Sequence, residues 1–295
     1  MIDSQHWQIR DAARDELAAA FAIFHDYEYH DDPTLPPFVV PDFLRHVART
    51  GRVLVAVSDA GIVGYAGAIT RGDVTHLTDL FVRPAVQSGS IGRALLAAIL
   101  PDTGTCCTCS TADPRALSLY VRAGMRPWWP QFALYGAAFP AGSLADGTVE
   151  IAVVRADHPA LIDWEREIGG RPRAEDFAYW AAHGAVALWF RRDGATLGYA
   201  IVRPRGGTVR HPDAATIGPL GVRRAEDAAA CTLAALGWTR AQAATLCWMI
   251  PGPHPALAAL LTAGFRIEDA YSFATSGDEP FYDPRRYISS GPDLF

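Results

Sequence analysis

Two short motifs in this chain occur twice, and the distance between copies is the same for both. LFVR at residues 80–83 returns as LGVR at 220–223, and AGMR at 123–126 returns as AGFR at 263–266. Both repeats are offset by 140 residues, from 80 to 220 and from 123 to 263. Chance similarities would fall at unrelated distances, so the constant offset predicts two copies of one domain.

The repeat sets the expected domain boundaries. A chain of 295 residues is long enough for about two domains of about 150 residues each. Residues 141–147 (AGSLADG) have the small, turn-forming composition of a linker. We therefore predict one domain over residues 1–140, a second over 148–280, and a tail over 281–295 that has no element of its own.

The remaining pattern predicts helices and strands in alternation, and so a fold of the α/β class. In the first half the sequence predicts strands at 7–10, 53–57, 62–70, 75–82, 105–110, near 125 and at 132–139, and helices at 12–24, 42–49, 91–100 and 114–123. The second half repeats this order, beginning with a strand at 149–155 and helices at 159–168 and 174–183.

The predicted strand at 75–82 carries polar and apolar side chains on opposite faces. Leu80 and Val82 lie on one face by alternation, and Asp79 and Phe81 lie on the other. This pattern is typical of a half-buried strand.

A turn of small residues, QSGSIG at 87–92, separates this strand from the helix that follows it. The first amides of a helix have no partner within the helix and favour an anion at that end. Small residues let a phosphate approach the backbone closely. The turn therefore predicts a phosphate-binding site.

Composition and charge exclude several classes of protein. The net charge of −6 and the pI of about 5.8 argue against a nucleic-acid partner. No apolar run approaches the roughly 20 residues of a membrane span, and the first residues do not have the pattern of a signal peptide. We interpret the five cysteines as packed thiols of a reducing cytoplasm and expect no metal site: Cys106, Cys107, Cys109, Cys231 and Cys247.

Two motifs of the first half resemble those of the GNAT family of N-acetyltransferases. The family's acyl-CoA signature is Gln/Arg-x-x-Gly-x-Gly/Ala; Gln87 and Gly92 fit it, and Ser90 replaces the middle glycine. The family's next motif, Leu-Tyr-x-x-x-Gly-Phe, resembles residues 119–125. Asp113 precedes that helix as an expected N-cap. The resemblance implies two tandem GNAT-like domains, each a mostly antiparallel mixed sheet flanked by helices, with splayed central strands.

The resemblance also implies a reaction. An acetyl group would pass from acetyl-CoA to an amine of a small molecule or peptide, by direct attack in a ternary complex. The residues expected to bind the coenzyme are Leu80, Phe81 and Val82 on the strand, Gln87, Ser88, Gly89, Ser90, Ile91, Gly92 and Arg93 at the turn, and Asp113 and Arg115 at the later helix.

The same resemblance points to Tyr120 and His76 as catalytic residues, and Asp79, on the opposite strand face by alternation, is a second candidate base. Tyr120 matches the tyrosine that protonates the departing thiolate, although it could simply pack beside the coenzyme. His76 and Asp79 are candidates for the general base, since a protonated amine must lose a proton before it attacks. The alternatives are an exposed histidine at a strand end and an aspartate that ties the strand to a neighbouring loop. A main-chain amide near Val82 would stabilise the oxyanion.

An acidic and aromatic stretch at 25–32 falls between the first two predicted helices, where this family covers its acceptor. We expect Tyr27, Glu28 and Tyr29 to contact the acceptor and to favour a cationic amine. The alternative is a solvated acidic loop.

The second half lacks the groups that would carry this chemistry. At the same offset the turn becomes DAAACT at 227–232, which has no glycine and begins with an acid, and Tyr120 becomes Leu260. An acid there would repel phosphate. We therefore predict a degenerate second domain with a structural or substrate-shaping role.

Other functions compete with this interpretation. A non-catalytic acyl-CoA sensor or interaction module would keep the phosphate-binding turn but would not catalyse acyl transfer. A tandem acyltransferase of the mycothiol-synthase type would have its active site in the second domain, whereas in this chain the second half has lost the phosphate-binding turn and the tyrosine. We expect a monomer or homodimer.

Overall fold

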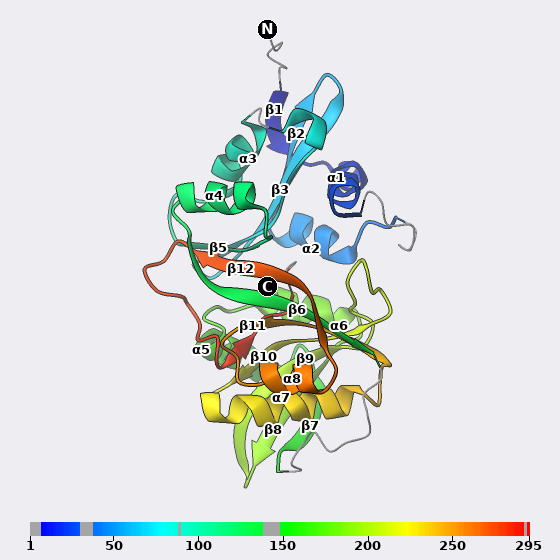
Figure 1. Ribbon diagram of the computed structural model, residues 1–295, viewed down its shortest axis with the longest axis vertical. Helices are drawn as coiled ribbons and strands as arrows, with labels where there is room; N and C mark the ends of the chain where they lie inside the picture. Colours follow the sequence, from blue (N-terminus) through cyan, green and yellow to red (C-terminus); the bar gives the residue numbers. More distant parts are fainter. Residues whose placement is uncertain (1–6, 30–37, 88–89, 138–147, 292–293) are drawn as a thin grey trace. The chain divides into compact units, whose positions relative to one another are not determined.

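The computed structural model describes residues 7–29, 38–87, 90–137, 148–291 and 294–295 (Figure 1). The chain forms two compact units, Met1–Thr108 and Cys109–Asp293. The domain boundaries expected from the repeat, at 140 and 148, remain a prediction, and the linker lies outside the described residues. In the part of the chain that the structure describes, no helix has the length and apolar character needed to span a membrane.

The first unit is a sheet of five strands with helices on both faces. Its elements are β1 (Trp7–Asp11), a 3₁₀ turn (Arg14–Glu16), α1 (Leu17–Tyr29), α2 (Asp42–Thr50), β2 (Arg52–Ser58), β3 (Gly61–Arg71), β4 (Val74–Val82), a 3₁₀ turn (Pro84–Val86), α3 (Ile91–Ile99) and β5 (Thr105–Ser110). The strand order is β1-β2-β3-β4-β5. Neighbours are antiparallel except β4 and β5, which are parallel.

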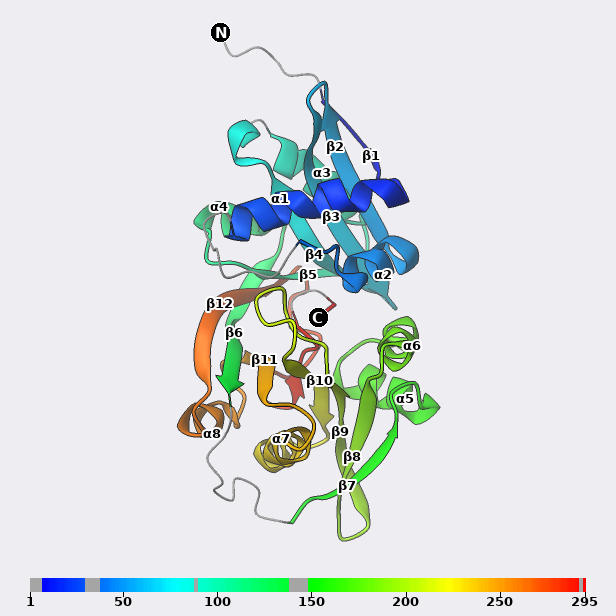
Figure 2. The same cartoon turned by 90° about the vertical axis from the view of Figure 1, so that its right-hand side faces the viewer.

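Helices α1 and α3 cover opposite faces of this sheet (Figure 2). The ring of Phe24 on α1 meets the ring of Phe81 on β4, with centroids 5.1 Å apart. On the other face, a Cβ built at Gly64 of β3 would lie 3.2 Å from Leu95 of α3 and 3.3 Å from Val82. The predicted alternation along β4 is therefore confirmed, with Phe81 toward α1 and Val82 toward α3.

Strands β4 and β5 pair over only a short stretch before they separate. The parallel register joins residues 74–76 to residues 105–107 and goes no further. A final contact follows, in which the Thr108 Oγ1 hydroxyl donates to the Leu77 carbonyl oxygen at 3.1 Å. The predicted splaying of the central strands is confirmed, and one edge of β4 has no strand partner beyond this point among the described residues.

The second unit repeats this plan and adds strands. Its elements are α4 (Pro114–Arg122), β6 (Arg126–Ala137), β7 (Glu150–Arg155), α5 (Pro159–Ile168), α6 (Ala174–Ala182), β8 (Val186–Arg192), β9 (Ala195–Arg203), β10 (Ala215–Val222), α7 (Ala225–Thr239), β11 (Thr245–Pro251), α8 (Leu257–Thr262), β12 (Arg266–Thr275) and β13 (Tyr287–Ile288). The strand order is β12-β6-β11-β10-β9-β8-β7, with β13 on β10. The expected mixed α/β fold with helices flanking mixed sheets is confirmed in both units.

Strand β6 differs from the prediction in two ways. It is one strand where two short ones were expected, and it pairs with β11 and β12 of the second half, not with strands of the first. Local periodicity could not show this, because strand pairing between distant segments depends on tertiary structure.

The tail also differs from the prediction. Residues 281–295 were expected to have no element, but β13 pairs antiparallel with β10, Leu220 opposite Ile288 and Gly221 opposite Tyr287. Strands β10 and β11 pair in parallel only at residues 215–216 and 246–247. Strand β13 therefore lies beside the part of β10 that no longer pairs with β11.

His254, between β11 and α8, is held neutral by its surroundings. Burial lowers its pKa to about 3, against an opposing effect of Asp283. Its Nδ1 accepts a hydrogen bond from the Ala256 amide at 3.3 Å, which requires the unprotonated nitrogen.

Acidification should therefore destabilise the protein through His254. Below pH 6.5 the imidazole is protonated in the unfolded chain, whereas in the folded protein it stays neutral down to about pH 3. The free energy of unfolding therefore falls as the pH drops from 6.5 to 3. Between pH 7 and pH 5 the loss is about 2 kcal/mol. Urea unfolding at several pH values measures it. His254→Asn keeps a side-chain acceptor but does not titrate, so its free energy of unfolding should depend less steeply on pH. An unchanged pH dependence would show that His254 does not have this role.

Candidate functional site

The free edge of β4 points two main-chain amides away from β3. The Arg83 amide donates to the Val63 carbonyl of β3 at 2.9 Å. Successive amides of a strand alternate in direction, so those of Leu80 and Val82 point to the opposite edge, where β5 no longer pairs. Peptide groups at such an edge can bind an extended ligand as a further strand would.

Gln87 ties the following turn to this edge. Its side-chain Nε2 donates to the Val82 carbonyl oxygen at 3.1 Å. Ser88 and Gly89 lie outside the described residues. Helix α3 then begins after Ser90, and the Ala94 amide is the first to bond within it, to the Ser90 carbonyl at 3.0 Å.

The first amides of α3, those of residues 91–93, are left for acceptors outside the helix. They come from Ile91, Gly92 and Arg93, three of the residues predicted at the phosphate turn. The exposed Arg93 guanidinium donates to the Ser90 hydroxyl at 3.4 Å and adds positive charge there. These groups suit an anion such as a phosphate.

Ser90, which stands at the position of the middle glycine in the family's signature, has a left-handed backbone conformation that favours glycine. Its φ of 66° and ψ of 0° lie in the left-handed region, which costs a residue with a Cβ about 1 to 2 kcal/mol. Ser90→Gly should raise the free energy of unfolding by about 0.5 to 1 kcal/mol, since glycine's larger unfolded-state entropy offsets part of the relief. Denaturant unfolding checks this against Ser90→Ala, which keeps the strain. A destabilised glycine variant would contradict it.

Asp79 is a buried carboxyl on the face of β4 that points toward α1. It is 6% exposed, and it accepts hydrogen bonds from the Tyr65 hydroxyl at 2.9 Å and the Thr78 hydroxyl at 2.7 Å. Burial raises the pKa of Asp79, and these two hydrogen bonds partly offset the rise. A carboxyl with a raised pKa is suited to proton transfer near neutral pH. Its hydrogen-bond partners Tyr65 and Thr78 were not identified from the sequence.

Aromatic rings surround Phe81 on the same face. Its ring centroid lies 6.1 Å from that of Tyr27 on α1 and 5.8 Å from that of Tyr65. Tyr29 contacts Phe24, which in turn contacts Phe81. Tyr27, Glu28 and Tyr29 were expected in a loop, but they form the last turn of α1, with Glu28 exposed. The expectation of a loop at these residues is wrong because α1 continues five residues beyond its predicted end.

His76 is 1% exposed and packs against β5. Its Nδ1 lies 3.8 Å from the Cys107 sulfur, and the two residues are opposite each other in the parallel register. The alternative of an exposed histidine at a strand end is therefore wrong. Of the two predicted bases, Asp79 shares its face of the sheet with the aromatic residues, whereas His76 lies where β4 and β5 still pair.

The second unit holds the other predicted site residues, at helix α4. Asp113 is the N-cap, as expected, and accepts a hydrogen bond from the Arg115 amide at 2.8 Å. Its carboxylate also pairs with the Arg115 guanidinium at 2.8 Å. Tyr120 is buried in this helix, which ends at Arg122 and is followed by Gly124 with a φ of 89°. The structure thus gives Asp113 and Arg115 a role in starting the helix.

In the second half, helix replaces the turn. Helix α7 begins at Ala225, so the residues equivalent to the turn are helical. Asp227 is buried in its first turn and accepts a hydrogen bond from Arg192 at 2.7 Å. Leu260, the counterpart of Tyr120, belongs to the hydrophobic core. A buried carboxylate thus stands where the first half offers amides to an anion.

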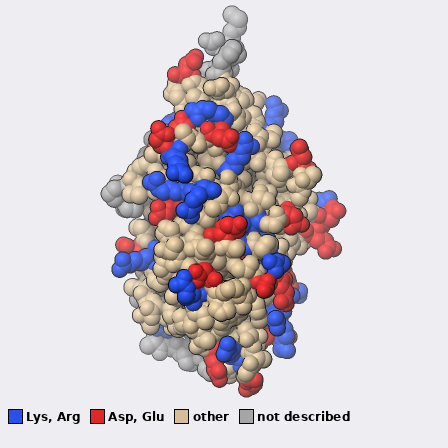
Figure 3. All heavy atoms as spheres, turned by 180° about the vertical axis from the view of Figure 1, so that it is seen from behind, with Lys and Arg blue, Asp and Glu red and all other residues tan. Residues whose placement is uncertain are grey.

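The described residues contain no group of three or more side chains arranged to hold a metal ion. None of the five cysteines forms a disulfide. Burial raises the pKa of Cys231 and of Cys247 to about 12, so both remain thiols. On the face shown in Figure 3, basic side chains lie among acidic ones across the described residues.

Comparison with known families finds a match that begins at the end of α2 and includes the whole of α4. Residues 49–126 match the profile described as "Acetyltransferase (GNAT) domain". This range includes β4, the turn and the helix of Tyr120. No curated protein matches the chain.

Solved structures show the same fold over nearly the whole chain. A protein of Pyrococcus horikoshii assigned as an acetyltransferase has a TM-score of 0.73 at 16% identity, covering 98% of this chain and 96% of its own. A GCN5-related N-acetyltransferase from Sphaerobacter thermophilus has a TM-score of 0.63 at 16% identity, covering 94% and 98%. A tandem GNAT protein from the clavulanic acid biosynthesis pathway has a TM-score of 0.60 at 18% identity, covering 93% and 100%.

Proposed function

We propose that this chain, which matches the GNAT acetyltransferase profile over residues 49–126, transfers an acetyl group from acetyl-CoA to an amine at a site in its first half. The observation that carries this proposal is the β4 edge. There the amides of Leu80 and Val82 point away from β3 after β5 has separated. The second half has the same splayed strands, but its own tail occupies the equivalent edge.

The groups at this edge fit the coenzyme. Acetyl-CoA carries a diphosphate, an extended arm with amide groups, and an acyl thioester. The amides of Ile91, Gly92 and Arg93 at the start of α3 would hold the phosphates, with Gln87 keeping the turn against β4. Leu80 and Val82 would pair with the arm through main-chain groups, and Phe81, the third predicted contact on this strand, lies between them with its main chain paired to β3. The remaining predicted contacts, Ser88, Gly89, Ser90, Asp113 and Arg115, are part of the same proposal.

When bound, acetyl-CoA supplies an acyl group activated as a thioester. Asp79 would take the proton from the amine, directly or through a water molecule, and its raised pKa makes it a stronger base than an exposed aspartate. His76 is the second candidate for this role. The Val82 amide would stabilise charge on the carbonyl oxygen, and Tyr120 would hold the proton for the leaving thiolate.

We propose a cationic amine of a small molecule or peptide as the acceptor. The rings of Tyr27 and Phe81, with Tyr29 close by, lie on the same face of the sheet as Asp79. Ring faces attract cations, and exposed Glu28 adds negative charge at the end of α1. We propose that the protein is a monomer or homodimer and has no nucleic-acid partner. A cytoplasmic location is favoured by five cysteines that form no disulfide.

Release of free thiol from acetyl-CoA tests the function. The full chain is supplied with acetyl-CoA and, one at a time, polyamines, aminoglycosides, amino acids and peptides. We expect amine-dependent thiol release and an acetylated product with at least one cationic acceptor. Coenzyme binding without turnover across the panel would instead favour an acyl-CoA sensor, and absence of binding would overturn both.

Tyr120→Phe should lower turnover and leave acetyl-CoA affinity nearly unchanged. The hydroxyl is needed only when the thiolate departs, so its removal affects the transition state and not the bound ground state. A loss of about 10²-fold in kcat is expected for a general acid. Initial rates and a coenzyme titration of the same preparation measure the two quantities. An unchanged rate would leave Tyr120 with a packing role only.

A further inference from the structure

The tail of the chain bonds to main-chain groups of β10 as a bound peptide would. The Val222 amide donates to the Arg286 carbonyl oxygen at 3.0 Å, and the Arg286 Nε donates back to the Val222 carbonyl oxygen at 3.2 Å. The neighbouring Arg223 amide points the other way, to Leu197 of β9. Val222 is thus the counterpart of Val82, with its amide directed at the edge from which β11 has separated.

We infer that residues 286–290 are an internal ligand of the second half. This tail strand, as we call these residues, occupies the edge of β10 that corresponds to the proposed coenzyme edge of β4. The part of this inference that concerns coenzyme rests on the proposed function. The part that concerns the tail strand rests on contacts within the second unit alone.

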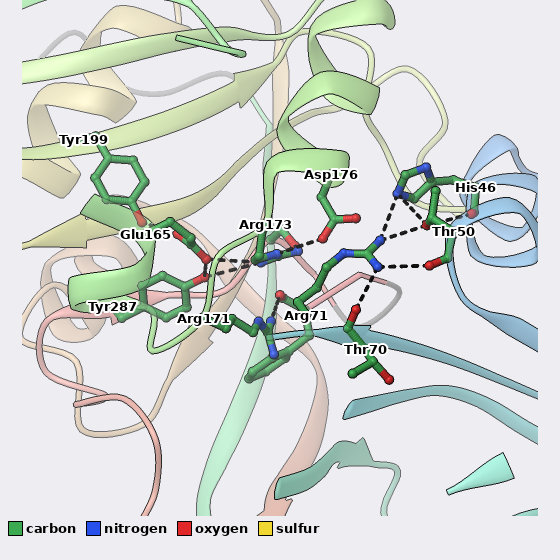
Figure 4. Close-up of polar contacts among 12 residues, drawn as sticks. His46, Thr50, Thr70, Arg71, Glu165, Arg171, Arg173, Asp176, Tyr199 and Tyr287 are labelled. Atoms are coloured by element: carbon green, nitrogen blue, oxygen red, sulfur yellow. Dashed lines mark hydrogen bonds and ion pairs between the residues drawn. The ribbon is translucent and has the colours of Figure 1, made fainter. Parts of the chain in front are cut away.

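A buried polar network holds the tail strand in place (Figure 4). The Tyr287 hydroxyl donates to Glu165 of α5 at 2.7 Å, and the Tyr199 hydroxyl of β9 donates to the other oxygen of the same carboxylate. Burial and the neighbouring Glu165 carboxylate raise the pKa of Tyr287, so its hydroxyl remains a donor. The network therefore depends on a side chain that the tail strand supplies.

Charged and amide side chains fix the residues that follow Tyr287. Arg173, buried between α5 and α6, pairs with Glu165 at 3.5 Å and donates to the Ser290 hydroxyl at 3.1 Å. Gln131 of β6 donates to the Ser289 hydroxyl and to the Met249 carbonyl of β11, each at 3.0 Å. The tail strand is therefore bonded to β10 on one side and, through Ser289, to β6 and β11 on the other.

Two glycines leave room for the tail backbone. A Cβ built at Gly218 of β10 would lie 2.2 Å from the Ser289 carbonyl oxygen, and one built at Gly170 would lie 2.2 Å from the Phe281 carbonyl oxygen. Both glycines have positive φ, at 149° and 76°. A side chain at either position would collide with the segment. The second half is thus shaped, as well as hydrogen-bonded, around residues 281–290.

This arrangement gives the chain one coenzyme site. The amide of Val222 is already bonded to Arg286, and Asp227 occupies the first turn of α7. A coenzyme would have to displace the tail strand and then approach a carboxylate. The second half would therefore bind no coenzyme while the tail strand remains.

Amide hydrogen exchange of the full chain tests the inference. Tyr287→Phe removes the hydroxyl that bonds Glu165 and keeps the ring. We expect residues 220–222 and 286–290 to exchange about tenfold faster, because a lost buried hydrogen bond shifts a local opening equilibrium by that order. Residues 188–190 of β8 should keep their rates. The control is Arg285→Gln, whose exposed side chain in the wild type pairs only with nearby Asp283 among the described contacts, and it should leave all these rates unchanged.

Each outcome decides a separate question. Equal acceleration across all strands of the second unit, or no acceleration, would overturn the inference, since the tail would then be an ordinary core strand without its own opening. A coenzyme titration is run in parallel. Two binding sites in the wild type would overturn the exclusion of coenzyme from the second half. No binding at all would defeat the proposed function while leaving the exchange result to stand.

Discussion

Asp79→Asn lowers turnover by about 10²- to 10⁴-fold and leaves acetyl-CoA affinity nearly unchanged, if Asp79 is the general base. The amide has nearly the size of the carboxyl and can still accept a hydrogen bond from Tyr65, but it cannot take a proton from the amine. Steady-state rates with the accepted amine and a coenzyme titration measure the two effects.

The pH dependence gives a second readout of the same substitution. Burial raises the pKa of Asp79, so the active carboxylate form increases as pH rises through a value above the ordinary one. The wild-type rate should therefore show an acidic limb that is absent in Asp79→Asn. Asp102→Asn, at an exposed acid of the same unit, serves as the control and should behave as the wild type. A wild-type rate in Asp79→Asn would transfer the role of base to His76.

Gly218→Ala destabilises the second unit by about 3 kcal/mol or more. The new methyl group would lie 2.2 Å from the Ser289 carbonyl oxygen, and φ is 149°, a region that residues with a Cβ rarely adopt. Overpacking and backbone strain each cost about 1 to 3 kcal/mol. Denaturant unfolding, followed by the fluorescence of the second unit's tryptophans, measures the loss.

The control for this substitution separates strain from collision. Gly184 also has a positive φ, 80°, but a Cβ there would meet nothing within 4 Å. Gly184→Ala should therefore cost about 1 to 2 kcal/mol from conformation alone. Equal losses at the two positions would show that the approach of Ser289 contributes little.

Features with a local signal could be predicted from the sequence. The capping of α4 by Asp113 follows from side-chain chemistry, and the two faces of β4 follow from alternation. The splaying of β4 and β5 came from the family resemblance alone. Asp79 could be named as a candidate base, but its environment could not, because Tyr65 comes from the neighbouring strand β3.

Features that depend on distant segments could not be predicted. The pairing of β6 with β11 joins residues more than 100 positions apart, and its own sequence favours no particular partner. The strand at Tyr287–Ile288 is too short to show a period of two residues. Its stability comes from β10 and from Glu165, which local sequence does not reveal. The acidic and aromatic composition at Tyr27, Glu28 and Tyr29 favours a loop, although these residues form the last turn of α1.

The most direct test of the central claim is to titrate the full chain with acetyl-CoA and follow amide protection residue by residue. Our account predicts one equivalent of coenzyme and new protection at Leu80, Val82 and residues 91–93, with residues 220–232 unchanged. Protection at residues 220–232 instead, or binding that leaves the amides of Leu80 and Val82 unprotected, would contradict it.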